Sequence, residues 1–327
     1  MENKNENINP ILEIEAEKEI FNLCKLDNNT KIAIGMSNNI LCIYSSDLSE
    51  KLATIDNQPS YYLSELSGRT SRNGIKVLCC SYSFQIKIIE LIFNNNKVQY
   101  NILHIIQPNE SRNEISKAIE LNNEDKNIAS IDEQNIIIYK LTPGVNYYET
   151  KKISVDDPND ILNINDKIFC VSFRNKGVLQ FYDNKNINLI KEIKNIESYG
   201  CNNYICKLNE NILCIGGFEY ISLVDIDFKQ LNNKIELIKY KERITCTCGV
   251  VENRLLFTGT KYKIDKEFLY DIIVYKLDCD NILQEVLRFP NAHDKIINCI
   301  IYINGTIISC SEDKKIKKWD LSNLINL

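Results

Sequence analysis

The chain has one tryptophan and two histidines, and no two of its 13 cysteines lie three positions apart, so the CxxC spacing of structural zinc sites is absent. It lacks any apolar run of about 20 residues, the length that a membrane-spanning helix needs. Its first residues, MENKNENINP, are too polar for a secretory signal peptide. These absences predict a cytoplasmic protein, with the nucleus as the alternative, and not a secreted one. They also predict buried free thiols, no metal site and no cofactor.

The chain also lacks an excess of positive charge. Its net charge is −5 and its pI is about 5.4, which gives no electrostatic reason to expect nucleic acid or an anionic membrane as a partner. There is no glycine-rich phosphate loop, nucleophile elbow or calcium loop, and the two histidines leave few general bases. We therefore expect a protein that is not an enzyme.

What the chain does have is a repeat. NLCKLDNN (22–29) and YICKLNEN (204–211) are both alternating strands that end in a polar turn and precede a second strand. A third strand then reaches an aromatic or apolar marker residue, and successive markers are 42 to 51 residues apart. The seven markers are Tyr44, Ile89, Tyr139, Tyr182, Val224, Tyr275 and Trp319. This period predicts an all-β fold, a seven-bladed β-propeller of four-stranded antiparallel blades.

The last blade is one strand short at the carboxyl end of the chain. Only LSNLINL (321–327) follows Trp319-Asp320, which is too little for another strand. The alternating segment ILEIEAE (11–17) near the amino end supplies a suitable edge strand. We therefore predict that residues 1–10 form a flexible tail and residues 11–327 a single propeller. The N-terminal strand is expected to complete the last blade and so close the ring.

The segment HDKIINCIIYINGTIISCSEDKKIKKWD (293–320) resembles the WD-repeat pattern, in which a histidine comes early and the unit closes on Trp-Asp. The period extends the resemblance over residues 11–327, although only this blade carries the full motif. Blade four retains Ser172 and the pair Tyr182-Asp183. Glycine-rich propeller families fit less well, because the chain has only 11 glycines. In the WD-repeat family a hydrogen-bonded tetrad locks the blade, and the resemblance implies that its members here are His293, Ser309, Asp313 and Trp319.

Partner contacts in that family lie mostly on the loops of one face. In this chain those loops are expected at residues 107–114, 155–160, 196–202, 240–243 and 260–271, of which the last is an insertion rich in aromatic residues. The candidate partner-binding residues are Arg112, Asp157, Tyr199, Arg243, Tyr262, Phe268 and Tyr270.

The predicted function is a non-catalytic scaffold that presents these loops to other proteins as a subunit of a hetero-complex. One alternative is a substrate- or phosphopeptide-recognition subunit of a ubiquitin ligase or a similar complex. That alternative needs a basic pocket, for which Arg112, Lys241, Arg243 and Lys261 are available. Another alternative, a propeller hydrolase, needs buried carboxylates around a metal ion.

Overall fold

The structure, a computed structural model, contains strands and turns and no helix in the part of the chain that it describes. It forms two compact units. The first unit comprises residues 21–205, and the second comprises residues 206–327 together with residues 1–20. The described residues are 9–59, 61–66, 74–80, 85–94, 97–107, 115–121, 125–141, 147–174, 177–194, 196, 204–226 and 235–321.

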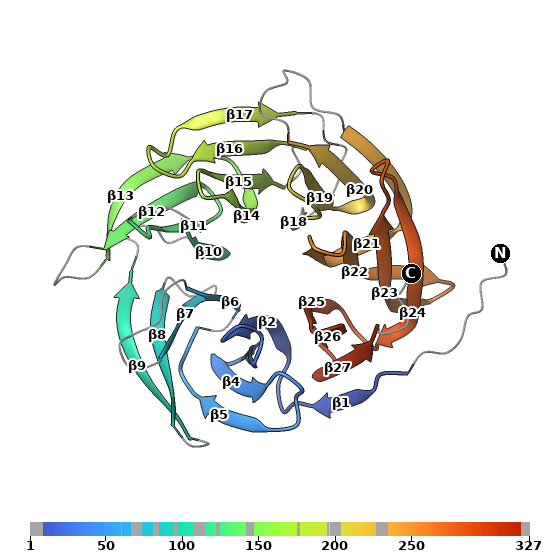
Figure 1. The fold of residues 1–327 in the computed structure, drawn as a ribbon, viewed down its shortest axis with the longest axis horizontal. Coiled ribbons are helices and arrows are strands. Elements are labelled where there is room, and N and C mark those ends of the chain that lie inside the picture. The colour runs from blue at the N-terminus through green and yellow to red at the C-terminus, as the bar shows by residue number, and fades with distance from the viewer. Residues whose placement is uncertain are drawn as a thin grey trace. The chain divides into compact units, whose positions relative to one another are not determined.

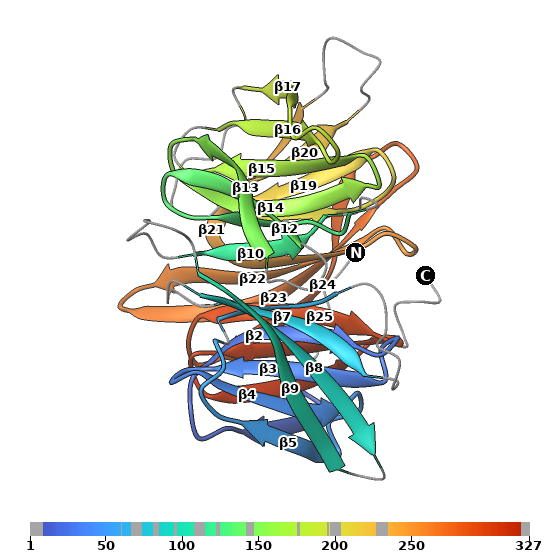
Figure 2. The same ribbon diagram turned by 90° about the vertical axis from the view of Figure 1, so that its left-hand side faces the viewer.

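Four antiparallel sheets of four strands each account for the first unit. They are blade one, β2 (Ile20–Leu26), β3 (Lys31–Met36), β4 (Ile40–Ser45) and β5 (Lys51–Ile55); blade two, β6 (Tyr62–Glu65), β7 (Ile75–Cys80), β8 (Ile86–Asn94) and β9 (Lys97–Ile106); blade three, β10 (Lys117–Glu120), β11 (Ile128–Ile131), β12 (Asn135–Leu141) and β13 (Tyr147–Ser154); and blade four, β14 (Pro158–Asn165), β15 (Ile168–Phe173), β16 (Leu179–Asp183) and β17 (Leu189–Ile193). Figure 2 shows the long β8–β9 hairpin of blade two.

The remaining three blades belong to the second unit, apart from the start of β18. Blades five and six form one continuous sheet, because the 16-residue strand β21 is the last strand of one and the first strand of the other. The strands are blade five, β18 (Tyr204–Lys207), β19 (Ile212–Gly216), β20 (Phe218–Asp225) and β21 (Ile235–Val250); blade six, β21 with β22 (Leu255–Ile264), β23 (Glu267–Leu277) and β24 (Leu283–His293); and blade seven, β25 (Ile297–Ile303), β26 (Thr306–Ser311), β27 (Lys315–Asp320) and β1 (Leu12–Glu15).

The predicted fold class, a seven-bladed β-propeller of four-stranded antiparallel blades, is confirmed. Each of the seven marker residues lies in the third strand of its blade, and each is at least nine-tenths buried. The repeat is visible in the sequence because each blade buries an aromatic or branched apolar side chain at this position of its third strand.

Short polar turns explain the asparagines between the inner strands. The two-residue β25–β26 turn is Asn304-Gly305, and the three-residue β3–β4 turn (37–39) contains Asn38 and Asn39; all four of these residues have positive φ. Two consecutive residues with positive φ form the turn whose twist matches that of a tight β-hairpin. Asparagine and glycine adopt this conformation at the lowest cost, so the turn residues set the register of each hairpin.

The strand β1 completes the last blade, as the sequence predicted. It runs antiparallel to β27, with Ile14 opposite Ile316. Backbone N–H groups of Ile11 and Ala16 extend the ladder by donating to the carbonyls of Lys318 and Lys314 at 2.8 and 2.7 Å. Figure 1 shows the blue strand β1 beside the red strand β27. The two ends of the described chain are thereby joined in one sheet.

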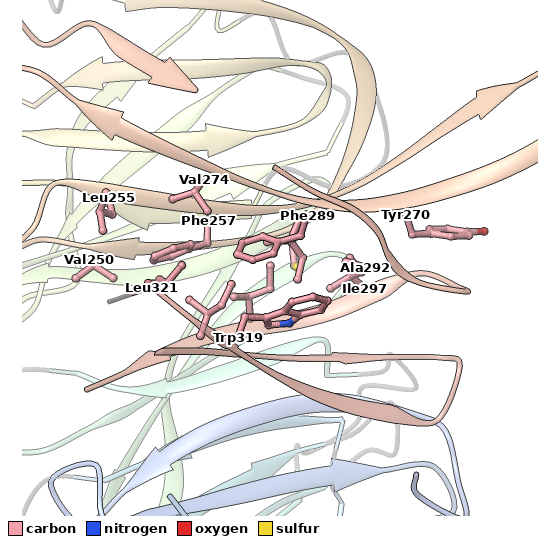
Figure 3. Close-up of a cluster of buried hydrophobic side chains, with 14 residues drawn as sticks. Val250, Leu255, Phe257, Tyr270, Val274, Phe289, Ala292, Ile297, Trp319 and Leu321 are labelled. Carbon is pink, nitrogen blue, oxygen red and sulfur yellow. The ribbon is translucent and has the colours of Figure 1, made fainter. Parts of the chain in front are cut away.

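Apolar side chains fill the space between neighbouring blades within each unit. The cluster between blades six and seven contains Phe257, Phe289 and Trp319, and the rings of Phe289 and Trp319 lie 4.9 Å apart (Figure 3). Trp319 is only 2% exposed. Aromatic side chains bury a large area, so this residue contributes strongly to packing of the last blade against blade six.

Candidate functional site

The four residues of the expected tetrad lie together where the end of blade six meets blade seven. His293 is the last residue of β24, Ser309 lies in β26, Asp313 follows β26 in the turn, and Trp319 lies in β27. The Nδ1 atom of His293 is 2.8 Å from the Asp313 carboxylate, and its Nε2 atom is 2.8 Å from the Ser309 hydroxyl. The indole N–H of Trp319 donates to the same hydroxyl at 3.0 Å. The four side chains therefore form one continuous chain of hydrogen bonds.

Donor and acceptor roles fix the protonation state of this chain. A carboxylate only accepts, so His293 Nδ1 carries the hydrogen and Nε2 is left to accept from Ser309. Burial lowers the pKa of His293 below its ordinary value, although Asp313 opposes the shift. For Asp313, burial raises the pKa, but hydrogen bonds from His293 and from backbone N–H groups outweigh it and lower the pKa to about 2. A neutral imidazole beside an ionised carboxylate satisfies every bond in the chain.

Ser309, His293 and Asp313 have the connectivity of a hydrolase triad, so their accessibility matters. Ser309 is 0% exposed and its oxygen already accepts the Trp319 N–H. A nucleophile must be reached by a substrate carbon, and this hydroxyl is covered on all sides. The hydroxyl of Ser309 is therefore out of reach of a substrate. The other histidine, His104, lies on the outer strand β9 with its ring edge-on to Tyr147 at 5.2 Å.

The described residues include no cluster of three or more histidine, cysteine, aspartate or glutamate side chains that could hold a metal ion. All 12 described cysteines are free thiols, and eight of them are buried. Burial raises the pKa of thiols such as Cys79, Cys246 and Cys310 well above the ordinary value, which keeps them protonated.

Two of the seven candidate partner-binding residues, Arg112 and Tyr199, lie outside the described residues. Arg112 was also expected to contribute to the basic phosphopeptide pocket, so that contribution lies outside them as well. Asp157 lies in the first unit, just before β14. It has positive φ, and its carboxylate is 3.9 Å from the guanidinium of Arg174. The stretch 155–160 is only partly a loop, because Pro158 already begins β14.

The segment YKER (240–243) is not the loop that its charges suggested. It lies inside the continuous strand β21, where Arg243 is opposite Phe218 of β20 and opposite Lys261 of β22. A strand that bends from one blade into the next needs no separate loop. The charged residues mark the place where β21 changes partners.

The aromatic insertion at 260–271 is an extension of the β22–β23 hairpin. Tyr262 is opposite Leu269, Lys263 is opposite Phe268, and the turn follows Ile264. The pairing of β22 with β21 ends at Lys261, and the pairing of β23 with β24 ends at Tyr270. The tip beyond these positions is therefore a two-stranded ribbon. Figure 2 shows β22 as a long arrow that runs to the edge of the drawing.

Because side chains alternate along a strand, the hairpin has two different faces. One face carries Tyr262, whose hydroxyl donates to the Asp271 carboxylate at 3.0 Å. The Asp271 side chain is fully buried and also accepts from Arg288 and from the backbone N–H of Asn291. Arg288 in turn bonds Glu242 at 2.7 Å. Tyr262 is therefore a structural residue, tied into a buried polar network.

The other face of the hairpin, which we call the cationic face, carries Lys261, Lys263 and Phe268, with Arg243 beside them on β21. The amines of Lys261 and Lys263 lie 4.3 and 5.6 Å from the centre of the Phe268 ring, which is 52% exposed. Tyr270 lies on the same face but is only 9% exposed and packs in the cluster between blades six and seven (Figure 3). Of the three aromatic candidates in this hairpin, only Phe268 is largely open to solvent.

Sequence reasoning missed a buried ion pair in the first unit. Lys117 on β10 contacts Asp160 on β14, and the second Asp160 oxygen accepts the backbone N–H of Ile205 at 2.9 Å. Burial lowers the pKa of Lys117, but the Asp160 carboxylate more than offsets this and raises it. The partners are 43 positions apart and belong to successive blades, so no local pattern reveals them.

A cavity of about 310 Å³ also lies in the first unit, between the end of blade three and the outer part of blade four. Val155, Phe173 and Val178 form its apolar lining. Its polar rim includes Glu192, which bonds Gln180 at 2.7 Å and Lys194 at 2.8 Å. These rim groups satisfy one another, so the cavity offers few polar atoms to a ligand.

Comparison with known proteins agrees with this architecture. No protein-family model matches the chain, and no curated protein matches it. Among solved structures, Sqt1 of Saccharomyces cerevisiae superposes with a TM-score of 0.64 at 10% identity, covering 96% of this chain and 99% of that one. A chain of the mitotic checkpoint complex superposes with a TM-score of 0.69 at 11% identity, covering 98% and 94%. Both are WD-repeat propellers, and this chain has the WD-repeat propeller fold.

No helix in the described part of the chain is long and apolar enough to cross a membrane.

Proposed function

We propose that this protein is a non-catalytic interaction scaffold that binds another protein through the cationic face of its β22–β23 hairpin, as a subunit of a larger assembly. The observation that carries the proposal is Phe268, a large aromatic side chain that is 52% exposed at the tip of a ribbon projecting from blade six. Interface hot spots are enriched in aromatic and arginine side chains, and this face combines both types.

The hairpin extension contributes little to the fold at its tip, which supports a role in binding. The ribbon beyond Lys261 and Tyr270 makes no ladder bonds to β21 or β24. Ile264, also at the tip, is 53% exposed. Exposed apolar side chains add nothing to the packed core, and a projecting ribbon that carries two of them is suited to a partner that buries them.

The tetrad and the polar network of Asp271 hold the base of this hairpin in place. Tyr270 is opposite His293 in the β23–β24 ladder, so the tetrad begins beside the cationic face. On the other side, Asp271 connects Tyr262 and Arg288 beneath the ribbon. A binding surface on a rigid support loses less conformational entropy when a partner binds.

Affinity purification of the tagged full-length chain, followed by mass spectrometry, tests the proposal. Phe268→Ser removes the exposed ring and should reduce recovery of the main partner by about tenfold, the effect of about 1.4 kcal/mol at an interface anchor. Ile102→Ser removes an apolar side chain that is 43% exposed on β9 and serves as the matched control, so its partner recovery should equal that of the wild type.

Equal recovery with all three proteins would show that the hairpin is not the binding surface. The identity of the recovered proteins also separates the two functional classes. Core subunits of a ubiquitin ligase would favour a substrate-recognition subunit, whereas a stable complex without them would favour the scaffold. The Arg243–Lys261 pair is the feature that gives the recognition alternative some support, because two adjacent cations suit an anionic ligand.

A further inference from the structure

The cationic face brings three positively charged side chains close together. Arg243 and Lys261 are directly opposite each other in the β21–β22 ladder, and Lys263 is two residues along the same side of β22. Like charges in directly opposite positions destabilise a sheet. None of the carboxylates whose side chains the structure describes forms an ion pair with any of the three. Since the whole chain has a net charge of −5, this local excess of positive charge does not follow from composition.

The surroundings of Lys261 include one carboxylate at longer range. Glu312, in the turn after β26, has its pKa raised by burial and by nearby Glu19, while Lys295 and Lys261 act in the opposite direction. The charge of Lys261 therefore acts to lower the pKa of Glu312, although the two side chains form no ion pair. The amine of Lys261 instead lies over the rings of Phe268 and Tyr270, at 4.3 and 5.9 Å from their centres.

From this arrangement we propose that the cationic face binds an extended acidic segment of a partner protein, with carboxylates at alternate positions and a large apolar side chain between them. Alternate side chains of an extended chain are about 6.5–7 Å apart on one side, which is the spacing that β22 imposes on Lys261 and Lys263. Arg243 is one strand away, about 5 Å to the side of Lys261. The apolar residue of the partner packs on Phe268. This inference rests on the proposed function and names the partner chemistry of the same surface.

Carboxylates fit this surface better than phosphate groups do. Tight phosphate recognition uses convergent arginine side chains that bind in a bidentate way. Here two of the three cations are lysines, and the strand holds them in a row. Each therefore offers a separate point charge, which matches separate Asp or Glu side chains. Nucleic acid needs a more extensive basic surface than three residues on a chain with a pI of about 5.4.

Fluorescence anisotropy with a labelled peptide tests the inference. The probe is Glu-Ser-Glu-Ser-Phe-Ser-Glu-Ser-Glu, which in an extended conformation presents its glutamates and phenylalanine on one side. The full-length protein should bind it, and Lys261→Gln/Lys263→Gln should weaken binding at least about tenfold, because two charge-assisted contacts are lost. Raising salt from about 0.05 M to about 0.5 M should weaken binding by the wild type much more than binding by the variant.

The matched control removes two lysines elsewhere. Lys51→Gln/Lys97→Gln changes the net charge by the same amount at exposed positions on β5 and β9, and it should bind the probe as the wild type does. Equal weakening in both double variants would overturn the inference, because the effect would then come from net charge alone. No binding of the probe, equal binding of a lysine-for-glutamate peptide, or binding only of a phosphoserine version would each overturn it as well.

Capture of the cellular partner separates this inference from the proposed function. Loss of the partner with both Phe268→Ser and Lys261→Gln/Lys263→Gln supports the two together. Loss with Phe268→Ser alone keeps the hairpin as the binding surface and rejects the acidic segment. Retention with both variants rejects the surface itself.

Discussion

Trp319 shows how a single residue links sequence to fold. It is opposite Ile307, and Ser309 lies two residues further on the same side of β26, which brings the indole N–H onto the hydroxyl. Blade three has the same register with smaller groups, because Tyr139 is opposite Ile128 and Ser130 occupies the position two residues on, although no hydrogen bond joins the two hydroxyls. Sequence comparison missed this equivalence, since Tyr139 lacks the following aspartate.

Blade four shows the opposite error. Ser172 and Tyr182 both match the WD-repeat pattern in sequence, but Tyr182 is opposite Phe169. Side chains alternate along β15, so Ser172 points to the other side of the sheet. The hydroxyl of Tyr182 instead donates to Gln180 Oε1 at 2.5 Å. A one-residue difference in register is invisible in a short motif and decides which side chains meet.

Trp319→Phe should lower the free energy of unfolding by about 0.5–1.5 kcal/mol for the lost hydrogen bond, in addition to a packing term. Ser309→Ala removes the other partner, so the two substitutions should be non-additive in a double-mutant cycle measured by urea unfolding and circular dichroism. Strict additivity would show that the indole N–H and the hydroxyl do not interact.

The tetrad also predicts a pH dependence. Because the pKa of His293 is lower in the folded than in the unfolded chain, the unfolded chain binds the proton first as pH falls. Stability is then fully present above about pH 6.5 and falls as pH decreases below that value. His293→Asn should flatten the change in urea midpoint between about pH 7 and 5.5. An unaltered slope in His293→Asn would contradict this assignment.

At the scale of elements, β1 completes the sheet of blade seven by pairing with β27. Leu12 and Ile14 of β1 are half-buried, and Glu13 reaches the amines of Lys315 and Lys317 at 3.2 and 3.4 Å. Removing residues 1–17 takes away these contacts and leaves one edge of β27 unpaired. We expect aggregation or a large fall in melting temperature, whereas removing residues 1–8 should change little. Equal melting temperatures for the two truncations would contradict the role of β1.

The Lys117–Asp160 pair links β10 to β14 in the same way. Lys117→Met leaves a buried carboxylate without its cation, and Asp160→Asn leaves a buried cation without its carboxylate. Breaking such a pair costs about 3–5 kcal/mol. The double variant should be more stable than the sum of the two losses implies, because it leaves no unpaired charge. Chemical denaturation of the three variants measures this coupling, and a double variant as unstable as that sum would argue against the pair.

At the scale of the whole molecule, the sequence was sufficient for the fold because strand alternation and blade period are local and repeated. Contacts between blades were harder to predict. Lys117 and Asp160 meet only after two blades pack, and YKER (240–243) resembled a loop because three of its four residues are charged. The candidate binding segment was found from its aromatic content. Which of its aromatic residues is exposed depends on the turn position, which composition does not reveal.

The faces of the hairpin follow from simple geometry once the turn is known. Lys263 is opposite Phe268, so an odd-numbered residue of β22 shares a face with an even-numbered residue of β23, and the reverse. Tyr262 then lies with Asp271, while Phe268 lies with the two lysines. The three aromatic residues that looked equivalent in sequence therefore have three different environments. Only one of them is available to anchor a partner.

Site-specific photo-crosslinking in cells tests the central claim most directly. Phe268 is replaced by p-benzoylphenylalanine, and Ile102, which is 43% exposed on the outer strand β9, is replaced in the same way as the control. The account predicts a discrete crosslinked partner from position 268 and none of that partner from position 102. No adduct at position 268, or the same adducts from both positions, would contradict the assignment of the hairpin as the binding surface.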